Sequence, residues 1–123
     1  AESPLNALYS FFETALTGPD EQRYMRQCLL VKSIAELDII GEVAKKTVLE
    51  SMQTLKVGFK HIIEACIEKG ELPEHTPTAL AAEWLQNQFV GLRAFAILQD
   101  DNKAIIQIIN KTLLDLKNEW PIA

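Results

Sequence analysis

The sequence has only two cysteines, Cys28 and Cys66, among its 123 residues, and neither belongs to a Cys-x-x-Cys pair. This scarcity excludes a disulfide-rich secreted scaffold and a cysteine-based zinc site. It predicts two buried free thiols in a reducing compartment, and hence a cytoplasmic protein. No apolar run approaches the about 18 residues of a membrane-spanning helix, and no secretory signal peptide opens the chain.

Clusters of basic residues are also lacking. Twelve Lys and Arg stand against seventeen Asp and Glu, which gives a net charge of −5, and the two signs are interspersed. Nucleic-acid-binding surfaces need clustered basic residues to displace counterions from phosphate, and anionic membrane surfaces attract the same clusters. We therefore do not expect this segment by itself to bind DNA, RNA or a membrane.

Motifs for catalysis or metal binding are missing as well. A di-iron bundle needs Glu-x-x-His on two helices, but neither His61 nor His75 has a glutamate three positions before it. Cys66 lies five residues after His61, which separates the two side chains by about 140° around a helix, so they do not form a nucleophile–base pair. The sequence therefore predicts no enzyme activity, no cofactor and no metal site.

What remains is helical periodicity, because strand-like alternation is not sustained anywhere. The expected fold is a single all-α domain over residues 1–123, built as an orthogonal or antiparallel bundle of five to six helices. Five helices can be placed from the apolar spacing. They cover residues 4–16, 20–36, 42–69, 77–98 and 102–119.

Helix-end signals set these bounds. The predicted N-caps are Ser3, Thr76 and Asp101, and Pro4 and Pro77 occupy the first helical position. Gly70 is placed as the residue that follows the third helix. Gly58 is out of place in the interior of that helix, and it predicts a kink or a close helix contact.

The last two predicted helices carry more apolar surface than one packing partner requires. We expect them to form a hairpin that pairs with its symmetry mate as a four-helix bundle, so that the protein is a homodimer. The alternative is that both are simply core helices. The predicted dimer-interface residues are Trp84, Leu85, Gln88, Phe89, Leu92, Ile105, Ile109, Leu113 and Leu116.

The first three predicted helices carry aromatic and soft side chains. Core packing explains each one singly, but together they predict an apolar cavity with a few hydrogen-bonding groups, as in ligand sites. The candidate effector-binding residues are Tyr9, Phe12, Tyr24, Met25, Cys28, Met52 and Phe59. The Tyr24 hydroxyl and Cys28 would orient a small apolar or amphipathic ligand, neutral or cationic rather than anionic.

Three segments resemble the C-terminal domain of TetR/AcrR-type regulators. Residues 25–37 are similar to a helix of that domain that often reads Gly-Cys-Leu-Leu-Val-Asn, with Gln27 and Lys32 in place of the usual glycine and asparagine. Residues 68–72 resemble its Gly-Glu-Leu turn. Residues 78–82 and 90–93 resemble its penultimate helix, and the likeness extends over residues 3–118.

This resemblance implies that the last two helices form the dimer bundle and that the earlier helices surround an effector cavity. It also implies a preceding three-helix DNA-binding unit. The chain opens at Ala1 without methionine and has no basic recognition helix, so we expect a piece that reaches DNA only through that missing unit. The leading hypothesis is the ligand-sensing, dimerising domain of a repressor that a small molecule releases from DNA.

Two other classes of function remain open. The first is a helical protein–protein interaction or scaffold module without a small-molecule site. A partly closed cavity with convergent polar groups favours the sensing domain, whereas a solid core favours the scaffold. A helical-bundle enzyme ranks third, because no metal or acid–base cluster is found.

Overall fold

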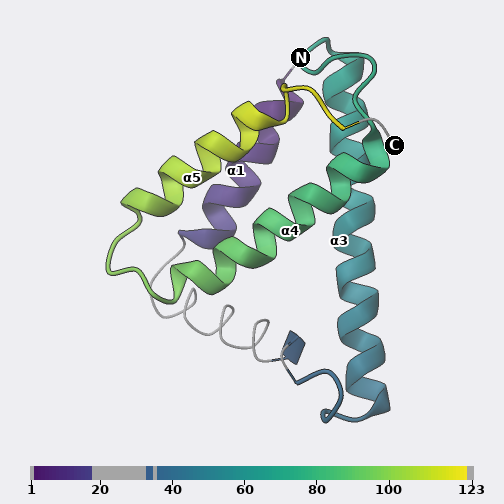
Figure 1. Ribbon diagram of the computed structural model, residues 1–123, viewed down its shortest axis with the longest axis vertical. Helices are drawn as coiled ribbons and strands as arrows, with labels where there is room; N and C mark the ends of the chain where they lie inside the picture. The colour runs from purple at the N-terminus through teal and green to yellow at the C-terminus, as the bar shows by residue number, and fades with distance from the viewer. Residues whose placement is uncertain (1, 18–32, 35, 122–123) are drawn as a thin grey trace.

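The computed structural model describes residues 2–17, 33–34 and 36–121. Within these ranges the chain is all-helical and contains no strand. The helices are α1 (Pro4–Leu16), α3 (Glu42–Glu68), α4 (Thr78–Ala96) and α5 (Lys103–Asp115). Figure 1 shows α3 as a long rod that projects beyond the other helices at its N-terminal end, with α4 crossing it and α1 and α5 lying to its left. The predicted helix over residues 20–36 lies mostly outside the described residues.

The first helix has the predicted bounds. The Ser3 hydroxyl accepts the N–H of Asn6 at 3.1 Å, and Pro4 occupies the first helical position. Both features satisfy or remove donors that have no partner in a first helical turn. Leu8, Phe12 and Leu16, four residues apart, form a fully buried stripe. Local sequence therefore determines where α1 begins, where it ends and which face it buries.

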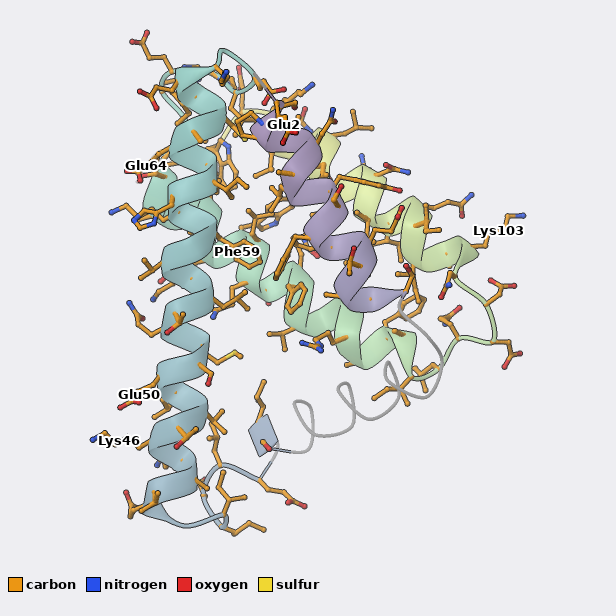
Figure 2. All side chains as sticks on the ribbon, turned by 180° about the vertical axis from the view of Figure 1, so that it is seen from behind. Glu2, Lys46, Glu50, Phe59, Glu64 and Lys103 are labelled. Carbon is orange, nitrogen blue, oxygen red and sulfur yellow. The ribbon has the colours of Figure 1, made fainter. Side chains whose placement is uncertain are left out.

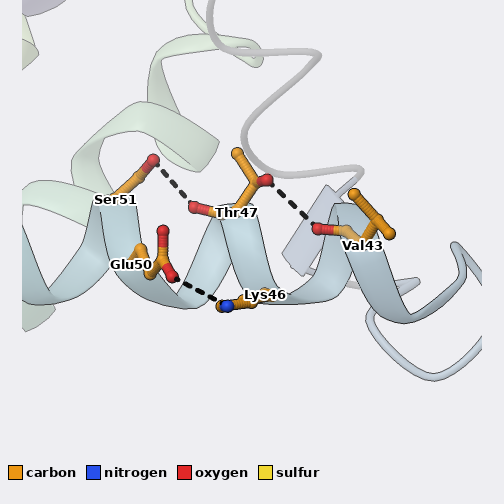
Figure 3. Close-up of polar contacts among 5 residues, drawn as sticks. All are labelled: Val43, Lys46, Thr47, Glu50 and Ser51. Carbon is orange, nitrogen blue, oxygen red and sulfur yellow. Dashed lines mark hydrogen bonds and ion pairs between the residues drawn. The ribbon is translucent and has the colours of Figure 1, made fainter.

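The two halves of α3 have different surroundings. Its buried residues, Phe59, Ile63 and Cys66, all lie in the C-terminal half, which packs against α1 and α4. In the N-terminal half, Val43 is 83% exposed. There the hydroxyl of Thr47 donates to the carbonyl oxygen of Val43 at 3.1 Å, as Figure 3 shows. This half of α3 satisfies its own polar groups.

Local contacts of the same kind continue along that half. The Ser51 hydroxyl donates to the carbonyl oxygen of Thr47 at 2.9 Å, and Lys46 pairs with Glu50 at 3.9 Å (Figure 3). In Figure 2, Lys46 and Glu50 point away from the other helices. An exposed ion pair of this kind contributes about 0.3–0.5 kcal/mol at most. These contacts all join residues within α3.

Helix α3 ends in a turn that needs a glycine. It stops at Glu68, one residue before the predicted end, and Gly70 adopts a positive φ of 76°. The N–H of Glu71 then donates to the carbonyl oxygen of Cys66 at 2.8 Å. Side chains other than glycine rarely adopt this backbone conformation at a helix end. The turn sends the chain back toward α1 and buries Leu72 in the core.

The predicted starts of the last two helices need correction. Helix α4 begins at Thr78 with Pro77 as its N-cap, and the Thr76 hydroxyl donates to the carbonyl oxygen of Pro73 at 2.7 Å instead of capping the helix. At α5, Asp101 does accept the N–H of Lys103, at 2.9 Å, although Asn102 holds the N-cap position. This helix ends at residue 115 rather than at 119.

Most of the predicted dimer-interface residues lie in the core of one subunit. Seven of the nine are at most 7% exposed, because α1 packs on α4 and α5 and α3 packs on α4. Their own chain encloses these seven side chains, so they are not presented at the surface of a single subunit. They are Leu85, Phe89, Leu92, Ile105, Ile109, Leu113 and Leu116. Only Trp84 and Gln88 remain half-buried.

Candidate functional site

Four phenylalanine rings meet where α1, α3 and α4 converge. Every pair among Phe11, Phe12, Phe59 and Phe89 lies within 5.3 to 6.2 Å, measured between ring centroids. Three of these rings are buried, but Phe11 is 43% exposed. Figure 2 shows Phe59 projecting from the middle of α3 toward the other helices. The cluster joins the three helices and presents one ring at the surface.

A groove of about 340 Å³ runs beside Phe11, between α1 and α3. Its volume lies at the lower end of the range for ligand sites, about 300–1,000 Å³. Apolar side chains form most of the described wall, in which Thr54 is the one polar residue. The lining residues are Leu8, Phe11, Thr54, Leu55, Gly58, Phe59 and Ile62.

Gly58 opens this groove. No atom of the described residues lies within 4 Å of the position that a Cβ on Gly58 would occupy. Among these residues none makes the predicted close helix contact at this glycine, and α3 continues through it without interruption. The missing side chain instead leaves the backbone of α3 accessible from the groove.

The structure brings only part of the predicted effector-binding set to this groove. Phe59 lines it, whereas Phe12 is fully buried beneath and does not reach its surface. Met52 is half-buried, and its carbonyl oxygen accepts the Gln86 amide of α4 at 2.6 Å. The other candidates on the second predicted helix lie outside the described residues. They are Tyr24, Met25 and Cys28.

Tyr9 belongs to a different groove. It lies on the side of α1 that faces α5, where a groove of about 440 Å³ has Lys117 at its rim. A hydrogen bond to the Glu13 carboxylate, with burial and the same negative charge, raises the pKa of Tyr9. The structure therefore places Tyr9 and Phe59 in two different grooves. The sequence reasoning missed Phe11, although its position three residues after Leu8 was visible.

Glu71 holds the end of α1 that adjoins this site. Its carboxylate accepts the Ser3 hydroxyl and the N–H of Leu5, the latter at 3.0 Å. These two hydrogen bonds are the main reason that the pKa of Glu71 is lowered, and the charges of Lys117 and Lys69 add to the shift. The turn after α3 therefore ties the two helices that form the groove.

Cys66, the one cysteine among the described residues, is not poised as a nucleophile. Cys66 is fully buried, and burial, together with the negative charge of Glu71, raises the pKa of its thiol to about 11. A protonated thiol is neither a nucleophile nor a metal ligand. In the described part of the chain, no group of His, Cys, Asp and Glu side chains could hold a metal ion.

The outer face of α4 and α5 carries a second set of exposed apolar groups. Trp84 is half-buried and meets Trp120 edge to face, with 5.7 Å between the ring centroids. Leu80 is 42% exposed one turn before Trp84. A groove of about 560 Å³ beside Trp84 is lined in part by Asp115 of α5. Ile108 is 36% exposed and lies seven residues, or two helical turns, before Asp115, so it is on the same side of α5.

These features define an all-helical domain with an apolar groove between its first and third helices. The family model for the tetracyclin repressor-like C-terminal domain matches residues 4–111, and the chain belongs to this family. The resemblance seen in the sequence is thereby confirmed. Neither the curated proteins nor the solved structures gave a significant match. None of the described helices is long and apolar enough to cross a membrane.

Proposed function

We propose that this chain is the effector-binding and homodimerisation domain of a TetR-like transcriptional repressor, and that its effector binds in the groove between α1 and α3. The observation that carries this proposal is the 43% exposure of Phe11 beside three buried phenylalanines. A domain with a purely structural core gains about 25 cal/mol for each Å² of apolar surface that it covers. An aromatic ring left open beside a groove is instead typical of a ligand site.

The groove lies between two helices that a ligand would contact together. A molecule that fills it touches Leu8 of α1 and Ile62 of α3, so it favours one spacing of these helices. In the intact regulator, α1 follows the DNA-binding unit in the chain. A shift of α1 relative to α3 on ligand binding therefore moves that unit. The effector releases DNA only if it binds the two arrangements with unequal affinity.

The groove is tested by filling it. Gly58→Leu places a side chain in the groove, and Thr47→Leu adds the same side chain at an exposed position of α3 outside it. A ligand found by thermal-shift screening should raise the Tm of the wild type and of Thr47→Leu by mass action, but not that of Gly58→Leu. Ligand binding that is unchanged in Gly58→Leu would contradict the proposal.

The homodimer forms through the outer face of α4 and α5. Trp84 and Gln88 belong to this face, with Leu80, Gly91 and Ile108. The helices of a second copy can approach closely at Gly91, where no atom lies within 4 Å of the Cβ position. This isologous contact replaces the predicted one, because its residues are accessible in a single subunit.

Charge substitutions on two sides of α5 test the dimer. Ile108→Glu should dissociate it in sedimentation analysis, because a buried unpaired charge is costly. Leu114→Glu is the control, since Leu114 is 62% exposed and lies on the side of α5 that faces α1. Leu92→Glu should unfold the protein instead, because Leu92 is a core residue. A dimer that survives Ile108→Glu and dissociates in Leu114→Glu would refute this interface.

A further inference from the structure

The chemistry of the groove wall restricts the effector further. We infer that the groove between α1 and α3 takes an uncharged, planar aromatic molecule that carries a hydroxyl or N–H donor. This inference rests on the proposed function, because it assumes that this groove is the effector site. Three observations on the groove wall carry it, and each concerns a different property of the ligand.

The ligand is uncharged because the described wall of the groove offers no counter-ion. None of its seven described lining residues is ionisable. The nearby Lys56 points to α4, where it pairs with Glu83 at 3.6 Å. A charge transferred from water to an apolar wall without a partner loses its hydration and gains nothing in return. This wall therefore favours neutral ligands over carboxylates and ammonium ions.

The ligand donates a hydrogen bond because Thr54 can only accept one. The Thr54 hydroxyl donates its single proton to the carbonyl oxygen of Glu50 at 3.0 Å. Its remaining hydrogen-bonding capacity is the pair of oxygen lone pairs. A ligand hydroxyl or N–H complements them, whereas an ether or ketone oxygen does not.

The ligand is planar and aromatic because of Phe11 and Gly58. Phe89 stacks on one face of Phe11, with 5.4 Å between centroids and 28° between the ring planes. Phe11 is 43% exposed and lines the groove, so a ligand there can pack against the part of the ring that Phe89 leaves uncovered. On α3, the bare backbone at Gly58 leaves space for a flat ring. Aromatic pairs gain energy beyond their buried area, which favours an aromatic ring over a saturated one of the same size.

Four matched probes test the three properties on the full chain by isothermal titration calorimetry. They are para-phenylphenol, its methyl ether, biphenyl carboxylate and cyclohexylcyclohexanol. We expect para-phenylphenol to bind tightest, with the ether weaker by about three- to tenfold because one neutral hydrogen bond is lost. The carboxylate should lose at least about tenfold, and the saturated alcohol about three- to tenfold.

Variants assign each preference to its residue. Thr54→Val should remove the preference for the phenol over its ether, and Phe11→Leu the preference for the aromatic ring over the saturated one. Thr47→Val is the matched control for Thr54, since its hydroxyl donates to the carbonyl four residues earlier in the same way but lies outside the groove. That variant should bind all four probes like the wild type.

The outcomes separate this inference from the proposed function. Equal binding of the phenol and its ether, tighter binding of the carboxylate, or no binding of any probe would overturn the ligand class. In each of these cases a screening ligand whose binding is abolished by Gly58→Leu would still support the groove as the effector site. If Gly58→Leu affects no ligand at all, both the ligand class and the site are refuted.

Discussion

The carboxylate of Glu71 accepts the backbone N–H of Leu5 at 3.0 Å, across 66 residues of sequence. Glu71 lies three residues beyond the end of α3, and Leu5 lies in the first turn of α1. The positive φ of Gly70 makes this contact possible, because it turns the chain back toward α1. A negative charge at a helix N-terminus also interacts favourably with the helix dipole. The Gly-Glu-Leu turn therefore ties the C-terminal end of α3 to the N-terminal end of α1, the two helices that form the candidate effector groove.

Acid should weaken this connection. Because the folded state holds the pKa of Glu71 below its usual value of 4.5, the stabilisation is fully present above pH 4.5 and is lost as the pH falls through the lower folded value. Glu71→Gln should lower the Tm at neutral pH and flatten its acid dependence. Glu74→Gln, at an exposed position of the same loop, is the control. Parallel acid-denaturation curves for the wild type and Glu71→Gln would contradict this role.

Two glycines inside helices should be replaceable at a gain in stability. Gly58 in α3 and Gly91 in α4 both have an open Cβ position. Alanine at either site should raise the free energy of unfolding by about 0.5–1 kcal/mol, because it reduces the backbone entropy of the unfolded chain. Urea denaturation measures this effect. The two variants should differ in function, since Gly58→Ala narrows the groove and weakens ligand binding, whereas Gly91→Ala places a methyl group where the second copy approaches in the proposed dimer.

The four-phenylalanine cluster should respond unequally to truncation. Phe12→Ala removes a fully buried ring and should cost about 3–5 kcal/mol. Phe11→Ala should cost clearly less, because the ring is already 43% exposed. The two variants compare adjacent residues of one helix, so helix propensity does not distinguish them. Equal losses in chemical denaturation would show that Phe11 is a core residue and not a groove wall.

Cys66 should be inert in the folded protein. With Cys28 replaced by serine, Cys66 is the remaining thiol. Its alkylation should be slow in the native state and fast in denaturant, because the thiol is buried and its pKa is raised from 9 to about 11. Because the folded state raises the pKa of Cys66, this thiol contributes to the free energy of unfolding. That contribution is fully present below pH 9 and is lost as the pH rises through about 11. Rapid native-state labelling would contradict this burial.

The ends of α1 illustrate what local sequence decides. Ser3 and Pro4 satisfy or remove the free donors of the first turn, and Leu8 and Phe12 repeat at the helical spacing. These effects act within a few residues, so both bounds of the helix and its buried stripe could be predicted. The Gly70 turn was predictable for the same reason. At α4, however, Thr76 suited the N-cap and Pro77 the first helical position. In the structure the Thr76 hydroxyl donates to the Pro73 carbonyl oxygen instead, and Pro77 is the N-cap.

The site depended on how the helices cross. Tyr9 and Phe11 lie on opposite flanks of the buried stripe of α1, about 60° and about 100° from its centre at Phe12. Periodicity locates the centre of that stripe but does not tell which flank meets which neighbour. Packing turned Phe11 toward α3 and Tyr9 toward α5. In the same way, apolar spacing identified the buried faces of α4 and α5, but only the positions of α1 and α3 decided that their own chain covers those faces.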